Sequence, residues 1–154
     1  MAVHTFTLTI TNPDAWPPGG PQSNPPLYKF EFDGSPNHVQ KFGHIWLGPL
    51  GKPLTIEWKI DPASNFVFQP NAAGDGTSAL FISNDPAAKL QFNGLGVFSN
   101  PRLEANNTKL LVDYQYPGPG GAGGAPVVYY YRLNVIDQNQ NVPVFVDPII
   151  VDQP

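Results

Sequence analysis

The chain has 154 residues, of which 41% are apolar and 13% are charged, and its formal net charge is −4. This length and apolar fraction are enough for one self-sufficient core, while basic residues scattered singly along the chain disfavour binding to nucleic acid or to an anionic membrane surface. The absence of cysteine excludes disulfides, thiolate metal sites and cysteine nucleophiles.

Proline and glycine, 19 and 15 residues respectively, punctuate the sequence, and aromatic and β-branched residues fill the intervals between them. This pattern predicts many short strands joined by turns. The candidate strands, in chain order, are residues 6–10, 28–32, 44–47, 54–60, 66–68, 79–82, 90–92, 110–116, 127–136 and a proline-broken pair over 142–151.

The first strand shows the pattern most simply, because Phe6, Leu8 and Ile10 share one face and threonines occupy the other. Between the strands, the Pro-rich segment 12–26 and the Gly/Pro segment 117–126 are predicted to be loops. No helical period is sustained, and only a single helical turn around residues 103–105 is expected.

About eight or nine strands separated by frequent turns match a sandwich or a small barrel. No internal repeat or domain linker is evident. We therefore expect residues 1–154 to form one all-β domain, a two-sheet antiparallel β-sandwich of the immunoglobulin-like or the cupredoxin-like kind.

The three histidines are His4, His38 and His44. Imidazole is the commonest metal ligand, so together they could bind zinc or copper. The alternative is that His4 lies in the core or at an edge and the other two lie in loops. A blue-copper site needs a thiolate and an axial ligand, which this chain cannot supply, since it has no Cys and Met1 is its only Met. We expect no metal and no cofactor.

The sequence contains no motif that points strongly to a catalytic site. Glu57, like Glu31, falls on the polar face of a predicted strand, where a solvated or cross-strand role explains it more simply than a glycosidase pair does. No serine lies in a Gly-x-Ser-x-Gly elbow, and the glycine run 118–124 contains a proline and lacks a following Lys-Ser/Thr. We expect the protein not to be an enzyme.

Four residues form the ligand-binding hypothesis: Trp16, His38, His44 and Asp75. Trp16 lies in the Pro-rich loop, where an exposed ring could stack on a sugar; the alternative, which is the simpler explanation, is that the prolines fold it over a sheet edge. Asp75 belongs to a group of loop Asx residues that could bind calcium, but Asx residues beside glycine more often form turns.

The N-terminus shows neither a basic region nor a continuous apolar region of a signal peptide, and no apolar stretch approaches the ~20 residues that span a bilayer. We therefore expect a cytoplasmic protein that is not inserted in a membrane.

The last eight residues read Asp147-Pro148-Ile149-Ile150-Val151-Asp152-Gln153-Pro154. With the strand before them, they resemble the end of the bacterial DP-EP family, named for its Asp-Pro and Glu-Pro pairs. Asp147-Pro148 matches the first pair, while Gln153 stands where the family has Glu. That family consists of small uncharacterised β-sandwich proteins, so the resemblance implies the same fold and no activity or catalytic residues.

Three functions remain. The first is a non-catalytic sandwich that associates with proteins, including copies of itself as a homo-oligomer, which a low surface charge permits. The second is a module that binds a small ligand or carbohydrate through loop aromatics. The third is a metal-binding protein that uses His38 and His44.

Overall fold

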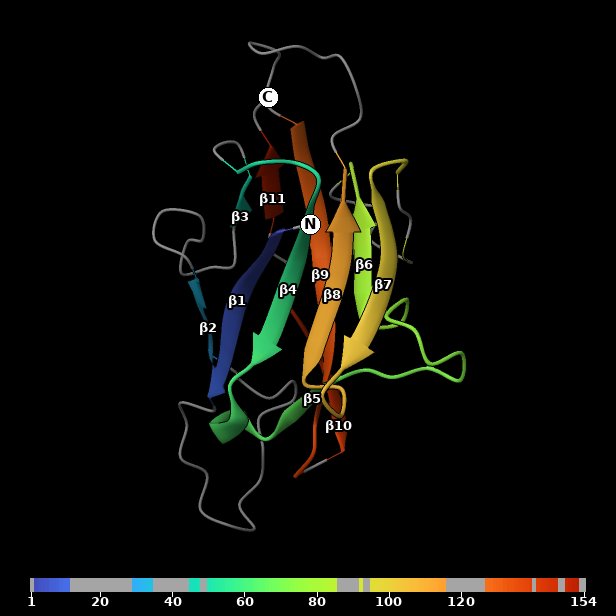
Figure 1. Cartoon of the computed structure of the whole chain (residues 1–154). Helices are drawn as coiled ribbons and strands as arrows, with labels where there is room; N and C mark the ends of the chain where they lie inside the picture. Colours follow the sequence, from blue (N-terminus) through green and yellow to red (C-terminus); the bar gives the residue numbers. More distant parts are fainter. Residues whose placement is uncertain are drawn as a thin grey trace.

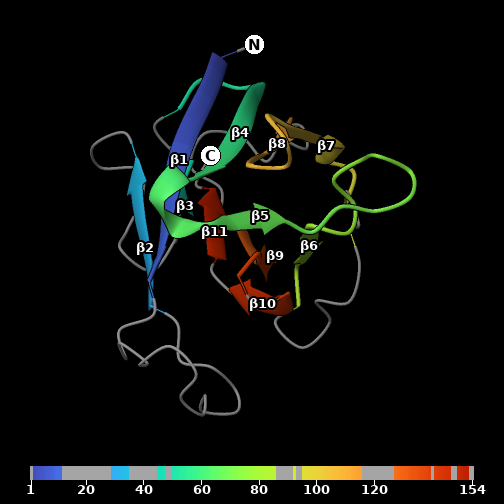
Figure 2. The ribbon, with the colours of Figure 1, turned by 90° about the horizontal axis from the view of Figure 1, so that it is seen from below.

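The alternating segments of the sequence form the strands of two facing sheets. The computed structural model describes residues 2–11, 29–34, 45–47, 50–85, 92, 95–115, 127–139, 141–146 and 149–152. Within them lie eleven strands and one short 3-10 helix. Figure 1 looks onto one sheet with the other behind it, and the end-on view of Figure 2 shows the two layers. The predicted all-β sandwich is confirmed, with more strands than the sequence suggested.

The first sheet contains five strands. Their order across the sheet is β2 (Lys29–Gly34), β1 (Ala2–Thr11), β4 (Leu54–Ile60), β8 (Lys109–Tyr114) and β7 (Phe98–Glu104). Most neighbours are antiparallel, but β1 and β4 run parallel. Parallel neighbours need a long connection, and residues 12–53 between these two strands supply it. The sheet is therefore mixed, whereas the sequence predicted antiparallel pairing throughout.

The second sheet is built around β9 (Val127–Asp137). Along one edge of β9, β10 (Val142–Val146) and β11 (Ile149–Asp152) pair in one continuous register, which confirms the predicted proline-broken pair. The same end of β9 that pairs with β10 also pairs with β5 (Phe66–Phe68), so β5 lies on the opposite edge, and β6 (Leu80–Ser83) follows it there. The two-residue β3 (Ile45–Trp46) runs parallel to β11.

A short capped turn carries the chain from the first sheet to the second. After β4, the side chain of Asp61 accepts a hydrogen bond from the backbone N–H of Ala63 at 2.9 Å and caps the 3-10 helix η1 (Pro62–Ser64). Asn65 then adopts a left-handed conformation, and β5 begins at the next residue. The Asp61-Pro62 pair therefore follows the end of β4 at Ile60, which is also where the predicted strand of residues 54–60 ends.

The inward side chains of both sheets form one core. Phe6, Leu8 and Ile10 are buried, as their alternation predicted. Trp58 of β4 is fully buried against Tyr131 of β9, with their ring centroids 5.2 Å apart, and its indole N–H donates to the tyrosine hydroxyl at 3.4 Å. Burial raises the pKa of Tyr131 well above its usual value, an effect that this hydrogen bond partly opposes.

Strand β7 is the main element that the sequence did not predict. A register shift between Ser99 and Arg102 marks a bulge that contains Pro101, and this irregularity breaks the period-2 pattern by which strands are recognised. The helical turn expected at residues 103–105 is wrong, since β7 continues to Glu104 and a left-handed turn begins at Ala105. In the predicted strand 90–92, Phe92 lies outside any strand, and the other two residues lie outside the described part of the chain.

Candidate functional site

Three of the four residues in the ligand-binding hypothesis, Trp16, His38 and His44, lie outside the described residues. Asp75 lies in the loop between β5 and β6. His4 lies on β1 in phase with the core residues and opposite Ile56 of β4, and it is partly buried. Of the residues proposed to bind a ligand or a metal, the structure therefore describes only Asp75 and His4, and they lie on separate elements.

The carboxylate of Asp75 organises its own loop. Its Oδ1 accepts hydrogen bonds from the Asn71 side chain at 2.7 Å, from the Thr77 backbone N–H at 3.0 Å and from the Thr77 hydroxyl at 2.6 Å. These bonds lower the pKa of Asp75 below its ordinary value. The bond from the Thr77 side chain has the largest effect, and the bond from Asn71 has the next largest. The geometry is that of a turn former, the alternative that the sequence also offered.

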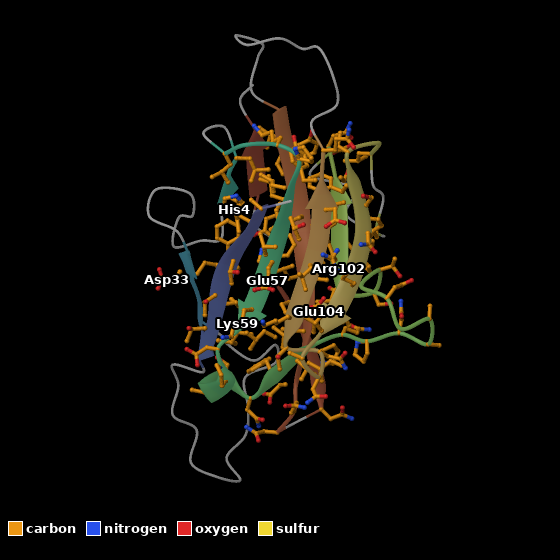
Figure 3. The ribbon with its side chains drawn as sticks, in the orientation of Figure 1. His4, Asp33, Glu57, Lys59, Arg102 and Glu104 are labelled. Atoms are coloured by element: carbon orange, nitrogen blue, oxygen red, sulfur yellow. The ribbon has the colours of Figure 1, made fainter. Side chains whose placement is uncertain are left out.

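The outward side of the first sheet carries most of the described charge. We call it the charged face, and Figure 3 shows five of its members on the near side of the sheet. Pairing registers and strand alternation assign it the following charged residues: Asp33, Glu57, Lys59, Arg102, Glu104, Lys109 and Asp113. Because only 13% of the chain is charged, this is a marked concentration on one surface.

Glu57 lies near the middle of the charged face and is only 8% exposed. Its Oε1 accepts a hydrogen bond from the hydroxyl of Thr5 on β1 at 2.8 Å, and its Oε2 lies 3.9 Å from Nζ of Lys109 on β8. The carboxylate therefore joins three neighbouring strands. The cross-strand role offered by the sequence is the one observed.

Asp113 gathers a second group of contacts on the same face. Its carboxylate accepts hydrogen bonds from the hydroxyl of Thr55 at 2.8 Å, from the guanidinium of Arg102 at 3.1 Å and from the side-chain amide of Asn100 at 3.1 Å. Burial by itself would raise the pKa of Asp113, but these three bonds and the charge of Arg102 outweigh it and hold the pKa below its ordinary value. Asp113 thus fastens the bulged strand β7 to its neighbours.

This lowered pKa predicts a loss of stability in acid. Because the folded state favours ionised Asp113, its contribution is complete above the unfolded pKa of about 3.8 and is lost as the pH falls through the lower folded value. Asp113→Asn is expected to reduce stability at neutral pH and to flatten the decline between about pH 5 and pH 3. Denaturant unfolding across that range measures how the free energy of unfolding changes with pH. Because Asp75 contributes equally in both proteins, an equal pH dependence in the wild type and in Asp113→Asn would contradict the role assigned to Asp113.

The outward side of the second sheet is different in character. On β9, four alternate residues, Tyr129, Tyr131, Leu133 and Val135, are buried in the core. The residues between them therefore point away from it. Val128 and Ile136 share this phase of β9, and residues of β5, β6 and β10 stand beside it in register. Two polar residues of this outward side, Ser83 and Asn134, are buried. We call the other described outward residues the apolar face: Val67, Phe81, Val128, Tyr130, Arg132, Ile136 and Pro143.

The apolar face carries little charge and remains partly accessible. Arg132 is its one charged member among the described residues, and Phe81 stands opposite it on β6. Pro143 is exposed and the other members keep part of their surface accessible, while Asn134 beside them is buried and donates to the carbonyl of Ser78 at 3.0 Å. Outward positions of an antiparallel sandwich are ordinarily polar, so this composition needs an explanation.

Sequence reasoning missed the apolar face although the signal was present. The run Val127–Ile136 was recognised as a strand because its residues are aromatic and β-branched. A strand with apolar residues in both phases has two apolar faces, which is typical of strands that are covered on both sides. In the sequence analysis, residues 127–136 were not interpreted in this way. The core can cover only one of these faces.

Two classes of site are not found in the part of the chain that the structure describes. There, His, Cys, Asp and Glu form no group of three or more that could hold a metal ion. None of the described helices has the length and apolar character required to cross a membrane.

Comparison with known proteins adds no assignment. No family model matches the chain, and neither a curated protein nor a solved structure matches it.

Proposed function

We propose that this protein associates with other protein molecules, including copies of itself, through the apolar face of its second sheet. The observation that supports the proposal is the contrast between the two outward surfaces. Seven charged side chains lie on one and only Arg132 on the other, counting the described residues. Apolar surface left on the outside of a soluble domain commonly marks an interaction site.

The composition of the apolar face fits an interface. Tyrosine, phenylalanine and arginine are enriched where proteins meet, because each gives a large contact area and tyrosine and arginine add hydrogen bonds. Tyr130 and Arg132 are successive outward residues of β9, and Phe81 stands opposite Arg132. Ile136, Val67 and Pro143 continue the surface toward the far end of the sheet.

Ile136→Asp tests this proposal. Introducing a carboxylate into an apolar contact would leave a charge without solvation, so association is expected to weaken by roughly tenfold or more. Sedimentation velocity over a wide concentration range measures the association constant. Val3→Asp is the matched control, because Val3 is 53% exposed on β1 and points outward from the first sheet, opposite Thr55.

The two variants separate the outcomes. Weakened association in Ile136→Asp, with Val3→Asp unchanged, is the result expected. A wild-type protein that stays monomeric at every concentration, or equal association in all three proteins, would rule out self-association through the apolar face.

A second candidate function is the binding of a planar ligand such as a sugar ring. The supporting observation is that Phe81, Tyr130 and Arg132 occupy outward positions of the adjacent strands β6 and β9, with Phe81 opposite Arg132. Tyr130→Ala would then abolish a carbohydrate-induced change in tyrosine fluorescence, whereas Val3→Ala would not. The absence of any such change with a panel of soluble oligosaccharides would reject this candidate.

The order of the strands in the first sheet helps to distinguish an immunoglobulin-like from a cupredoxin-like sandwich. The first strand lies between β2 and β4, while the first strand of an immunoglobulin constant-type sheet lies at its edge, so we propose the cupredoxin-like of the two expected forms.

Membership of the bacterial DP-EP family, a non-catalytic role and a cytoplasmic location rest on the sequence features alone. Metal binding through His38 and His44 stays the third alternative from the sequence, and elemental analysis would test it.

A further inference from the structure

The two edge strands of the first sheet, β7 and β2, differ in how they are protected from pairing with another chain. At β7, the bulge between Ser99 and Arg102 interrupts the strand, Pro101 has no N–H to donate, and its carbonyl accepts a hydrogen bond from the backbone N–H of Gly76 at 3.0 Å. Bulges, prolines and covering loops are the usual devices that keep an edge strand from pairing with another chain. The edge at β7 therefore has three of them.

Strand β2 contains neither a bulge nor a proline, and charged residues are the only such device within it. Its six residues, Lys29–Gly34, include no proline, and their register with β1 runs from Phe6 to Thr11 without a shift. No strand in the described part of the chain pairs with the other side of β2. A regular, proline-free edge strand offers its backbone groups to a further strand.

The charges along β2 suit a second copy of the same strand. Lys29, Glu31 and Asp33 stand opposite Thr11, Thr9 and Thr7 of β1, so the three charges occupy alternate positions. If two copies of β2 pair antiparallel with Glu31 at the centre, each Lys29 comes opposite an Asp33. Opposite charges in directly opposed positions stabilise a strand pair, and the like charges of the two glutamates at the centre oppose it.

We propose that two copies of this chain pair antiparallel through β2, so that two five-stranded sheets join into one of ten strands. A pairing centred on a residue keeps inward positions of one copy opposite inward positions of the other. The symmetry axis then stands normal to the sheet. Both apolar faces consequently point to the same side of the dimer, a consequence that rests on the proposed function.

The size of this contact sets its strength. Specific stable interfaces bury roughly 1,200–2,000 Å², and one short strand pair contributes only part of such an area. We therefore expect a reversible dimer whose population rises with protein concentration and falls with added salt.

A charge swap tests the pairing and its register. K29D and D33K each turn two favourable cross-strand pairs into repulsive ones, so each is expected to weaken the dimer by roughly tenfold. The double variant K29D/D33K restores opposite charges in both places and is expected to recover the wild-type constant. E31Q removes the central repulsion and is expected to tighten the dimer by a few-fold.

Sedimentation equilibrium at low ionic strength measures the constants, and circular dichroism confirms that each variant is folded. Weakening in both single variants with recovery in the double variant supports the proposal. A monomeric wild type, single variants without effect, or a double variant as weak as the single ones would each overturn it. Ile136→Asp lies on the other sheet and is expected to leave the pairing at β2 unchanged, and K29D is expected to leave association through the apolar face unchanged. The two variants therefore assign a loss of association to one contact or the other, whereas a monomeric wild type would overturn both.

Discussion

Replacing Trp58 by alanine is expected to lower the free energy of unfolding by about 3–5 kcal/mol. Trp58 is fully buried at the contact between the two sheets, with its ring 5.2 Å from that of Tyr131. Its removal costs the transfer free energy of the largest side chain and leaves a cavity that the two sheets cannot close without shifting. The Tyr131 hydroxyl, fully buried, also loses the indole N–H that it accepts at 3.4 Å.

Urea denaturation followed by circular dichroism measures this loss. Trp58→Phe keeps an aromatic ring but not the donor, so it is expected to lie between the wild type and Trp58→Ala. Val3→Ala is the matched surface control, because Val3 is 53% exposed, and its effect is expected to stay within about 0.5 kcal/mol. A loss below about 1 kcal/mol in Trp58→Ala would contradict the central position assigned to this residue.

Gly76→Ala is expected to destabilise the protein by about 1–3 kcal/mol. A methyl group at Gly76 would come within 2.9 Å of the backbone nitrogen of Arg102, 3.0 Å of the carbonyl carbon of Pro101 and 2.8 Å of Cδ1 of Leu110. Two of these neighbours are backbone atoms of β7 that cannot turn aside as a side chain does. The loop of Asp75 would have to move away from the edge strand, and the hydrogen bond from Gly76 to Pro101 would be lost.

Gly51→Ala is the control for this substitution. Gly51 is exposed, and a methyl group there meets no atom within 4 Å. The two substitutions change the entropy of the unfolded chain in the same way, so their difference isolates the close approach at Gly76. Thermal unfolding of both variants measures that difference, and equal midpoints would show that the loop does not rest against β7 as described.

Local alternation in the sequence predicted the strands well wherever one phase was polar. In β1 and β4 the apolar residues recur at every second position, which by itself identifies the buried side. In β7 the bulge at Pro101 interrupts that period, so the strand was mistaken in part for a helical turn. The parallel pairing of β1 with β4 had no local signal, because it depends on which distant strands become neighbours.

The candidate site was less accessible to sequence reasoning than the fold. Asp75 was named for its position among loop Asx residues, and its contacts with Asn71 and Thr77 are those of a turn. Thr55 and Glu57 lie on the polar side of β4, yet both are almost completely buried, because side chains of neighbouring strands cover them. Such burial arises only when the strands are brought together.

The sequence by itself determined that this protein is all-β, because strand formation depends on a two-residue period and on turn residues that are local properties of the chain. It also excluded thiol chemistry, since no cysteine is present. Only the tertiary structure decided where the charges and the apolar residues lie. Strand order and register set which outward residues become neighbours, and so one surface is charged, another is apolar, and β2 is left as a regular edge.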